Sequence, residues 1–104
     1  MNLADRLVLS VQGLHLRVRI LISGLVQGVF FRREIADLAR KRDINGWVRN
    51  LNDGSVEVVA EGDKEELDQL IHFCHVGPPG ARVRNVGVDW FDFKGEFRGF
   101  RITR

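Results

Sequence analysis

Apolar and polar residues alternate along several short stretches of the chain. Between positions 14 and 22 every even position is apolar, while His15, Arg17 and Arg19 occupy odd positions. Alternation with a period of two predicts a strand that buries one face. Related patterns predict further strands over 44–50, 55–61 and 86–90, and we expect a short last strand over 97–102.

Two other stretches have the periodicity of helices. Apolar residues at helical spacing among charged ones predict an amphipathic helix over 31–42. A second helix is expected after Asp63, because Asp63 and Glu66 have the spacing of a capping box, and the Gly-Pro-Pro-Gly segment at 77–80 ends it. The apolar stripes are Phe31, Ile35, Leu38 and Ala39 in the first helix and Leu67, Leu70, Ile71 and Cys74 in the second.

The order of these elements, βαββαβ followed by one more strand, predicts the fold class. It is α+β with the ferredoxin-like arrangement, a βαββαβ sandwich in which two helices cover one face of a mainly antiparallel sheet and a short extra strand ends the chain. The Asp53-Gly54 pair supplies the tight turn between the second and third strands. We expect a single domain over 14–104 and a dispensable N-terminal extension over 1–13.

This topology predicts where a ligand binds. The first and second strands run parallel with the third strand between them, so their carboxyl ends lie on one edge of the sheet, about 10 Å apart. The loop 24–31 leaves the first strand at that edge, and Asn50 ends the second strand there. Ligands often collect at strand carboxyl ends beside helix N-termini, so we expect the functional site at this edge.

The loop over 25–31 has the features of an anion-binding segment. Its backbone N–H groups lead into a helix N-terminus, where the helix dipole adds partial positive charge. Gly28 lets an anion approach the backbone, and Arg32 in the first helical turn could grip two oxygens of one phosphate. On the loop alone the alternative stays open that the glycines only permit a tight turn and that Arg32 is solvated, since no Gly-Lys-Ser/Thr of a Walker loop follows.

Two sequence motifs resemble the signatures of the acylphosphatase family. The first runs Gly24-Leu25-Val26-Gln27-Gly28-Val29-Phe30-Phe31-Arg32, and the second runs Gly46-Trp47-Val48-Arg49-Asn50 with Gly54, Val56 and Gly62 after it. Every fixed position of both signatures is filled, and the likeness extends over residues 15–104. The resemblance implies the ferredoxin-like fold and hydrolysis of the carboxyl–phosphate bond of acyl phosphates to a carboxylate and inorganic phosphate.

The resemblance also implies roles for the residues of both motifs. Arg32 and Asn50 are the implied catalytic residues, since the motif arginine binds the phosphate and the motif asparagine orients the attacking water. The implied phosphate-binding residues are Val26, Gln27, Gly28, Val29, Phe30, Phe31 and Arg32. A site without a general acid suits the reaction. The conjugate acid of the leaving carboxylate has a pKa of about 4, so the carboxylate needs no proton at neutral pH. We therefore expect no metal and no cofactor, an acyl phosphate as substrate, and inorganic phosphate as product and inhibitor.

Composition narrows the partners and the compartment. The 104 residues carry a formal net charge of only +2, and no basic run marks a nucleic-acid binder. No apolar run approaches the ~20 residues that span a bilayer. Asp5 and Arg6 interrupt the apolar N-terminus, which argues against a signal peptide. Cys74 is the single cysteine, so no intrachain disulfide can form. We expect a cytoplasmic monomer that binds neither nucleic acid nor membranes.

Other chemically active side chains have plainer explanations. His72, Cys74 and His75 cluster on the second predicted helix, but structural zinc needs four ligands and Cys74 belongs to the apolar stripe. Glu57 and Glu61 could be paired acids, but they are ~13 Å apart along a strand and we expect them to be solvated. The aromatic residues could stack on nucleic-acid bases, but we expect them in the core. They are Phe30, Phe31, Trp47, Trp90, Phe91, Phe93, Phe97 and Phe100.

Two rival functions stand beside acyl phosphate hydrolysis. A ferredoxin-like binding module could sense phosphate or bind nucleic acid, but the aromatic and basic motif of an RNA-recognition sheet is missing from the sequence. A carbamoyl-phosphate-handling domain of a larger maturation enzyme is similar, but the chain ends at residue 104 and we expect the free enzyme. Acetyl, carbamoyl, aspartyl and glyceroyl phosphates present the same phosphoryl end, so the motifs leave the acyl group open.

Overall fold

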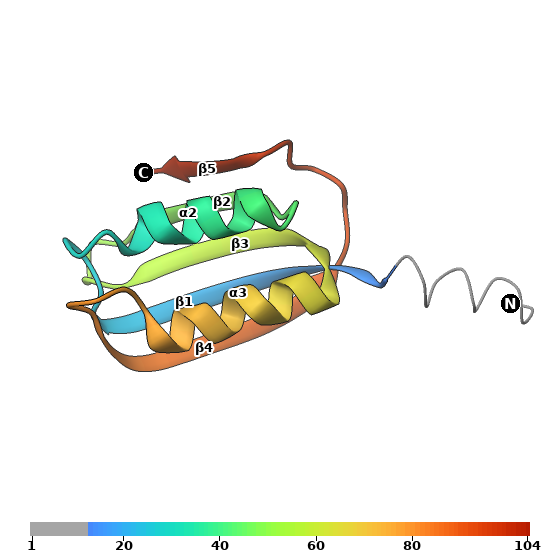
Figure 1. Cartoon of the computed structure of the whole chain (residues 1–104). Coiled ribbons are helices and arrows are strands. Elements are labelled where there is room, and N and C mark those ends of the chain that lie inside the picture. Colours follow the sequence, from blue (N-terminus) through green and yellow to red (C-terminus); the bar gives the residue numbers. More distant parts are fainter. Residues whose placement is uncertain (1–12) are drawn as a thin grey trace, which may run out of the picture.

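The computed structural model describes residues 13–104 (Figure 1). Its elements follow the predicted order, and most of the predicted N-terminal extension over 1–13 lies outside the described residues. The strands are β1 (His15–Leu25), β2 (Asn45–Asn50), β3 (Val56–Asp63), β4 (Arg82–Asp92) and β5 (Phe100–Thr103). The helices are α2 (Phe31–Lys41) and α3 (Lys64–Val76).

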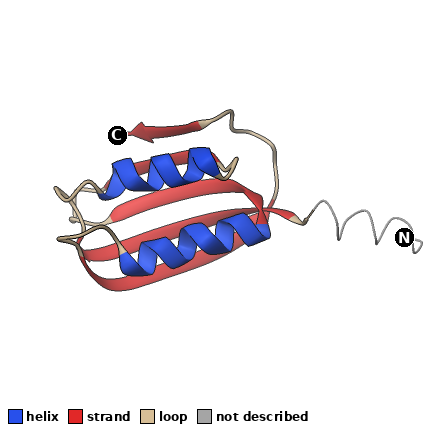
Figure 2. Ribbon diagram, in the orientation of Figure 1, coloured by secondary structure: helices blue, strands red, loops and turns tan. Residues whose placement is uncertain are grey.

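The strands form one sheet in the order β4-β1-β3-β2-β5. β1 pairs antiparallel with β3 and β4, and β2 pairs antiparallel with β3 and parallel with β5. β3 therefore lies between β1 and β2, as the split βαβ topology requires. Both helices pack on one face of this sheet (Figure 2), so the predicted α+β ferredoxin-like fold is confirmed.

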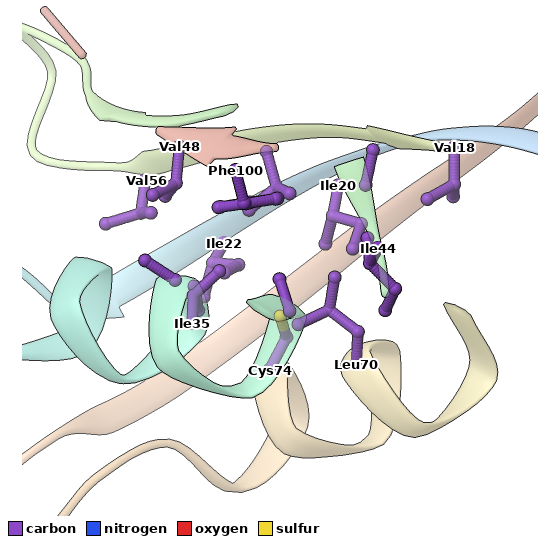
Figure 3. Close-up of a cluster of buried hydrophobic side chains, with 14 of the residues drawn as sticks. Val18, Ile20, Ile22, Ile35, Ile44, Val48, Val56, Leu70, Cys74 and Phe100 are labelled. Carbon is purple, nitrogen blue, oxygen red and sulfur yellow. The ribbon is translucent and has the colours of Figure 1, made fainter. Parts of the chain in front are cut away.

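The hydrophobic core fills the space between the sheet and the two helices (Figure 3). On β1 the even positions Val18, Ile20 and Ile22 are fully buried, as the alternation predicted. Burying a side chain of this kind contributes about 1.5–3 kcal/mol relative to leaving it in water. Cys74 is buried in the same core, and burial raises the pKa of its thiol to about 12, so it is an unreactive packing residue.

The N-terminus of α3 is capped as predicted, but the capping box is not closed. The Asp63 carboxylate accepts a hydrogen bond from the backbone N–H of Glu65 at 3.2 Å. The carboxylate of Glu66 pairs instead with Arg42 at 2.8 Å. This ion pair ties the start of α3 to the end of α2.

The prediction that Glu57 and Glu61 are solvated is wrong. Both lie on the sheet face without helices, yet the two residues are only 6% and 1% exposed. Arg17 lies opposite Glu61 in the β1–β3 register and contacts it at 3.2 Å. Glu57 accepts hydrogen bonds from Arg19 and Arg49, each at 2.7 Å. The period-two pattern identified the face correctly, but it could not show that arginines of the neighbouring strands cover both acids.

These contacts keep both carboxylates ionised. Burial opposes ionisation of Glu57, but the hydrogen bonds from Arg19 and Arg49 outweigh it, so its pKa lies below the ordinary value of 4.5. Burial also opposes ionisation of Glu61, but hydrogen bonds from the backbone N–H of Lys94 and from Arg17 lower its pKa in turn.

The last strand begins later than predicted, at Phe100 instead of residue 97. The backbone N–H groups of Lys94, Gly95 and Glu96 donate to the buried Glu61 carboxylate at 2.7, 3.2 and 3.2 Å. These three residues precede the predicted strand and form the turn before it. Within 97–99, the backbone N–H of Gly99 donates to the side-chain oxygen of Asn45 at 3.1 Å. The ladder between β2 and β5 begins with the pair Gly46 and Phe100.

Most of the aromatic side chains are outside the core, contrary to the prediction. Phe31 and Phe100 are buried, and Trp47 and Phe97 are half-buried against arginine side chains of the open face. The other four of the eight aromatic residues predicted in the core are 40–71% exposed: Phe30, Trp90, Phe91 and Phe93. The two helices cover one face of the sheet, so apolar residues on the other face and at the edges stay at the surface.

Candidate active site

Positive φ angles occur at the end of β1 and in the loop that joins it to α2. Gly24 has a φ of +131°, and a Cβ there would lie 2.1 Å from the carbonyl oxygen of Arg82, so glycine is required. Phe30 is also left-handed, with a φ of 64° and a ψ of 18°, and it precedes α2 without a side-chain capping hydrogen bond. The first N–H groups of α2 therefore have neither an intrahelical partner nor a side-chain cap.

Buried side chains anchor both ends of this loop. Val26 and Phe31 are each 1% exposed, and the Phe31 ring packs edge-to-face against Phe73 with 5.8 Å between ring centroids. Val29, between them, packs against the core. The core thus holds the loop backbone in place while the intervening peptide groups stay near the surface.

The side chain of Gln27 bridges this loop and the hairpin between β2 and β3. Its amide nitrogen donates to the carbonyl oxygens of Leu51 at 2.8 Å and Ser55 at 2.9 Å. Leu51 directly follows Asn50, so this Gln27 bridge fixes the loop relative to that asparagine. The sequence analysis placed Gln27 among the phosphate-binding residues. Because its side-chain amide donates to the hairpin, the backbone N–H of Gln27 is the donor that could bind an anion.

Asn50, the last residue of β2, carries an unsatisfied oxygen. Its side-chain Oδ1 is buried and has no hydrogen-bond partner within the part of the chain that the structure describes. Leaving a buried acceptor unpaired costs about 1–3 kcal/mol, so such atoms are uncommon and call for a water or ligand that completes them.

Asn50 and the loop meet in one pocket of about 270 Å³. The structure brings the two motifs together at the carboxyl edge of β1 and β2, as the topology predicted. Val29 is the predicted site residue that does not line this pocket, and Arg33 and Ile102 line it although the sequence did not single them out. Arg33 follows Arg32 in the same helical turn, whereas no local pattern could have placed Ile102 of β5 here.

Arg32 lies half-buried in the first turn of α2. Within residues 13–104 its guanidinium forms no ion pair. A cation at a helix N-terminus is opposed by the helix dipole, and Glu34, the acidic residue of the same turn, forms no ion pair with Arg32. The guanidinium, the dipole and the uncapped amides therefore make this end of the pocket electropositive and suited to an anion.

A larger hollow of about 590 Å³ lies on the open face of the sheet, between β2, β5 and the segment 96–99. Trp47, Arg49 and Arg101 are among its lining residues. None of its lining side chains holds a buried polar atom without a partner among the described residues, in contrast to Asn50. The smaller pocket is thus the better candidate for chemistry, because it brings the unsatisfied Oδ1 of Asn50 together with Arg32.

The metal alternative gains no support from the described residues. His72 and His75 are exposed on α3 while Cys74 between them is buried, so the three side chains do not converge. Residues 13–104 contain no cluster of three or more side chains from histidine, cysteine, aspartate or glutamate that could hold a metal ion. In the same part of the chain, neither helix has the length and apolar character needed to cross a membrane.

Comparison with known proteins decides the family. A sequence model of the acylphosphatase family matches residues 18–102. The chain belongs to the acylphosphatase family. The acylphosphatase of Pelotomaculum thermopropionicum is 50% identical over 87 residues, which are 84% of this chain and 95% of that protein. The acylphosphatase of Aeropyrum pernix is 50% identical over 94 residues, which are 89% of this chain and 93% of that protein.

Solved structures agree with this membership. The crystal structure of acylphosphatase from Bacillus subtilis matches with a TM-score of 0.82 and 35% identity, covering 86% of this chain and 99% of that one. The activity that the motifs implied, hydrolysis of an acyl phosphate to a carboxylate and inorganic phosphate, is confirmed by these relatives. They favour the enzyme over the binding module.

Proposed function

We propose that Arg32 and the backbone N–H groups of residues 26–32 bind the phosphoryl group of the acyl phosphate, and that Asn50 holds the attacking water. One observation supports this division of roles best. Asn50 and Arg32 line the same pocket, and among the described residues the buried Oδ1 of Asn50 has no hydrogen-bond partner and the Arg32 guanidinium has no ion pair. A water that donates to this oxygen and faces a bound phosphoryl group satisfies both residues at once.

The phosphoryl end of the substrate fits the electropositive end of the pocket. Uncapped amides at a helix N-terminus favour anions, and a guanidinium can bind two phosphate oxygens together. The pocket of about 270 Å³ is smaller than the ~300–1,000 Å³ that drug-sized ligands occupy. That size suits a small charged head group with the rest of the substrate outside.

The chemistry needs little more than this. The water oxygen attacks phosphorus, the bond between phosphorus and the acyl oxygen breaks, and the electron pair leaves with the carboxylate. The carboxylate needs no general acid, since its conjugate acid has a pKa of about 4. Phosphoryl transfer has a loose transition state, so a water placed by a neutral amide is a sufficient nucleophile when a phosphate oxygen takes its proton. Preorganised amides and Arg32 stabilise the charge on the equatorial oxygens.

On the same grounds we propose that the enzyme needs neither metal nor cofactor and works as a cytoplasmic monomer on small acyl phosphates, with residues 14–104 as its catalytic domain. No step above calls for a Lewis acid or a covalent intermediate. The buried Cys74 is the single cysteine of the sequence, which fits a reducing compartment. Activity that is lost in EDTA and restored by a divalent ion contradicts the metal-free mechanism.

Three variants test the two assigned roles. Arg32→Lys keeps the charge but loses the planar fork, so phosphate affinity and kcat/KM should fall, the latter by at least ~100-fold, the scale for losing one oxyanion donor. Asn50→Ala should keep the Kd for inorganic phosphate within a few fold while kcat collapses. Asn50→Asp should fail as well, because its negative charge lies beside an anionic substrate.

The outcomes separate the roles. Near-wild-type kcat/KM in Arg32→Lys removes the arginine from phosphate binding. An active Asn50→Asp means that proton removal limits the reaction and that Asn50 is not a neutral water holder. If both Asn50 variants lose phosphate affinity but keep kcat, Asn50 is a phosphate-binding residue instead.

A further inference from the structure

Two exposed apolar side chains border the pocket beside its cationic end. Phe30 is 71% exposed and Ile102 is 44% exposed, and both line the pocket that holds Arg32 and Asn50. Single exposed apolar residues are ordinary on protein surfaces. Here, however, two exposed apolar residues from different elements line the same pocket, and their position there needs an explanation.

Phe30 occupies a conformation that costs free energy. Its φ of 64° and ψ of 18° lie in the left-handed region, which is uncommon for a residue with a bulky side chain. Glycine adopts this backbone without strain, so the turn alone does not explain a phenyl ring here. The ring is mostly exposed and caps no helix N–H group, so the fold gains little from it. Strain of this kind at a pocket points to a ligand that uses the side chain.

Ile102 reaches the pocket from β5. It pairs with Val48 of β2, whose side chain is fully buried, and Phe100 two residues earlier is in the core. Ile102 therefore extends the apolar face of the sheet to the edge where core packing ends and the pocket begins. The Arg40 guanidinium of α2 donates to the carbonyl oxygen of Phe100 at 3.0 Å, which fixes β5 beside the helix.

We propose that Phe30 and Ile102 form a binding subsite for the acyl group, so that this enzyme prefers acyl phosphates whose acyl group is apolar or aromatic. This inference rests on the proposed function, because the phosphoryl group must occupy the cationic end before the acyl group can reach the apolar one. The two ends of the pocket then match the two ends of the substrate. An apolar acyl group covers both side chains and removes their surface from water.

Arg33 is the feature that favours a different substrate. It also lines the pocket, and it forms no ion pair within residues 13–104, so it would attract an acyl group with a negative charge of its own. Arg33 is exposed, however, and solvent and salt screen the charge of an exposed group. An anionic acyl group also leaves the strained Phe30 ring unexplained. The apolar subsite accounts for both Phe30 and Ile102.

The test compares benzoyl, acetyl and succinyl phosphates as substrates of the full chain. In the wild type, kcat/KM should be highest for benzoyl phosphate. Ile102→Ser should lower kcat/KM for benzoyl phosphate by about tenfold, the scale of one lost apolar contact in a pocket, and leave acetyl phosphate within about twofold. Intrinsic reactivity cancels when the benzoyl-to-acetyl ratio is compared between variants. Leu14→Ser is the matched control. Leu14 is 57% exposed and precedes the amino end of β1, whereas the pocket lies beyond the carboxyl end of that strand.

Further variants keep the test independent of folding. Phe30→Asn removes the ring with a residue that accepts the left-handed backbone, and it should lower the same ratio. Ile102→Leu should keep the wild-type ratio of kcat/KM for benzoyl and acetyl phosphates, because leucine is also apolar. Binding of benzoylphosphonate and acetylphosphonate, which are not hydrolysed, should show the same loss of discrimination without chemistry.

The failures are distinguishable. An unchanged ratio in Ile102→Ser and Phe30→Asn, or equal losses for both substrates, overturns the subsite, as does a wild-type preference for succinyl phosphate over benzoyl phosphate. Arg32→Lys reports on the proposed function separately. If it hydrolyses acetyl phosphate as well as the wild type does, the phosphate site is wrong whatever the ratio shows.

Discussion

Replacing Gln27 with alanine should uncouple the phosphate loop from Asn50. The substitution keeps the backbone N–H and removes two hydrogen bonds, to Leu51 at 2.8 Å and Ser55 at 2.9 Å. Both carbonyl oxygens keep a backbone partner, since Gly54 donates to Leu51 and Leu51 donates to Ser55. No acceptor is orphaned, so the loss of unfolding free energy should be about 1–2 kcal/mol in total. For a domain of this size that lowers Tm by about 5–10 °C.

The effect on catalysis should exceed what this loss of stability explains. A displacement of 1 Å at a reacting group can cost about 100-fold, so we expect kcat of Gln27→Ala to fall at least ~10-fold at a temperature where the variant is fully folded. The assay is steady-state hydrolysis of an acyl phosphate beside thermal unfolding. Asn45→Ala is the control, because its side-chain oxygen accepts one hydrogen bond from the backbone of Gly99 at 3.1 Å, away from the pocket. Wild-type kcat in Gln27→Ala despite a lowered Tm, or equal loss of kcat in Asn45→Ala, refutes this reasoning.

Three further outcomes follow from the ion pairs and the pocket. Glu57→Gln removes the carboxylate shared by Arg19 and Arg49, and because both arginines are more than a third exposed, urea unfolding should show a loss of only about 1–2 kcal/mol. The pKa values of Glu57 and Glu61 are lowered in the folded chain, so their stabilisation is complete above the ordinary value of 4.5 and is lost as pH falls below it. Urea titrations from pH 7 to pH 3 should show that loss, and it should be smaller in Glu57→Gln; a flat profile contradicts it. Phosphate and sulfate should inhibit competitively and raise the stability by about 2.7 kcal/mol at 100 times their Kd, and Arg32→Lys should lose this gain in a thermal-shift measurement.

The topology and the meeting of the two motifs at one edge of the sheet could be predicted because they depend on regular patterns. Alternation fixed which face of β1 is buried, and the order of elements placed the loop after β1 beside Asn50. The alternation of apolar and polar residues does not show which side chains cover the face of the sheet without helices. Glu57 and Glu61 were expected in water because the covering arginines come from other strands, and only the register brings them together.

The rim of the site escaped prediction for a different reason. Ile102 lines the pocket because β5 pairs with β2, a parallel pairing between segments far apart in the sequence that no local pattern encodes. The left-handed backbone of Phe30 runs against the preference of its residue type, so sequence reasoning assigns such a conformation to glycine or asparagine instead. Features set by distant pairing or by local strain become visible only in the structure.

The strand order also has a consequence for how the chain acquires its site. β2 and β3 are joined by a short hairpin, whereas β1 pairs with β3 and β4, and β2 pairs with β5, across long intervening segments. Pairings of high contact order close large loops and are slow to form. The pocket takes residues from the segment after β1, from the first turn of α2, from β2 and from β5, so a chain that has formed only its local hairpin and helices has the phosphate loop but not Asn50 or Ile102 beside it. The pocket that combines the phosphate loop with Asn50 and Ile102 is thus complete only when the long-range strand pairs have formed.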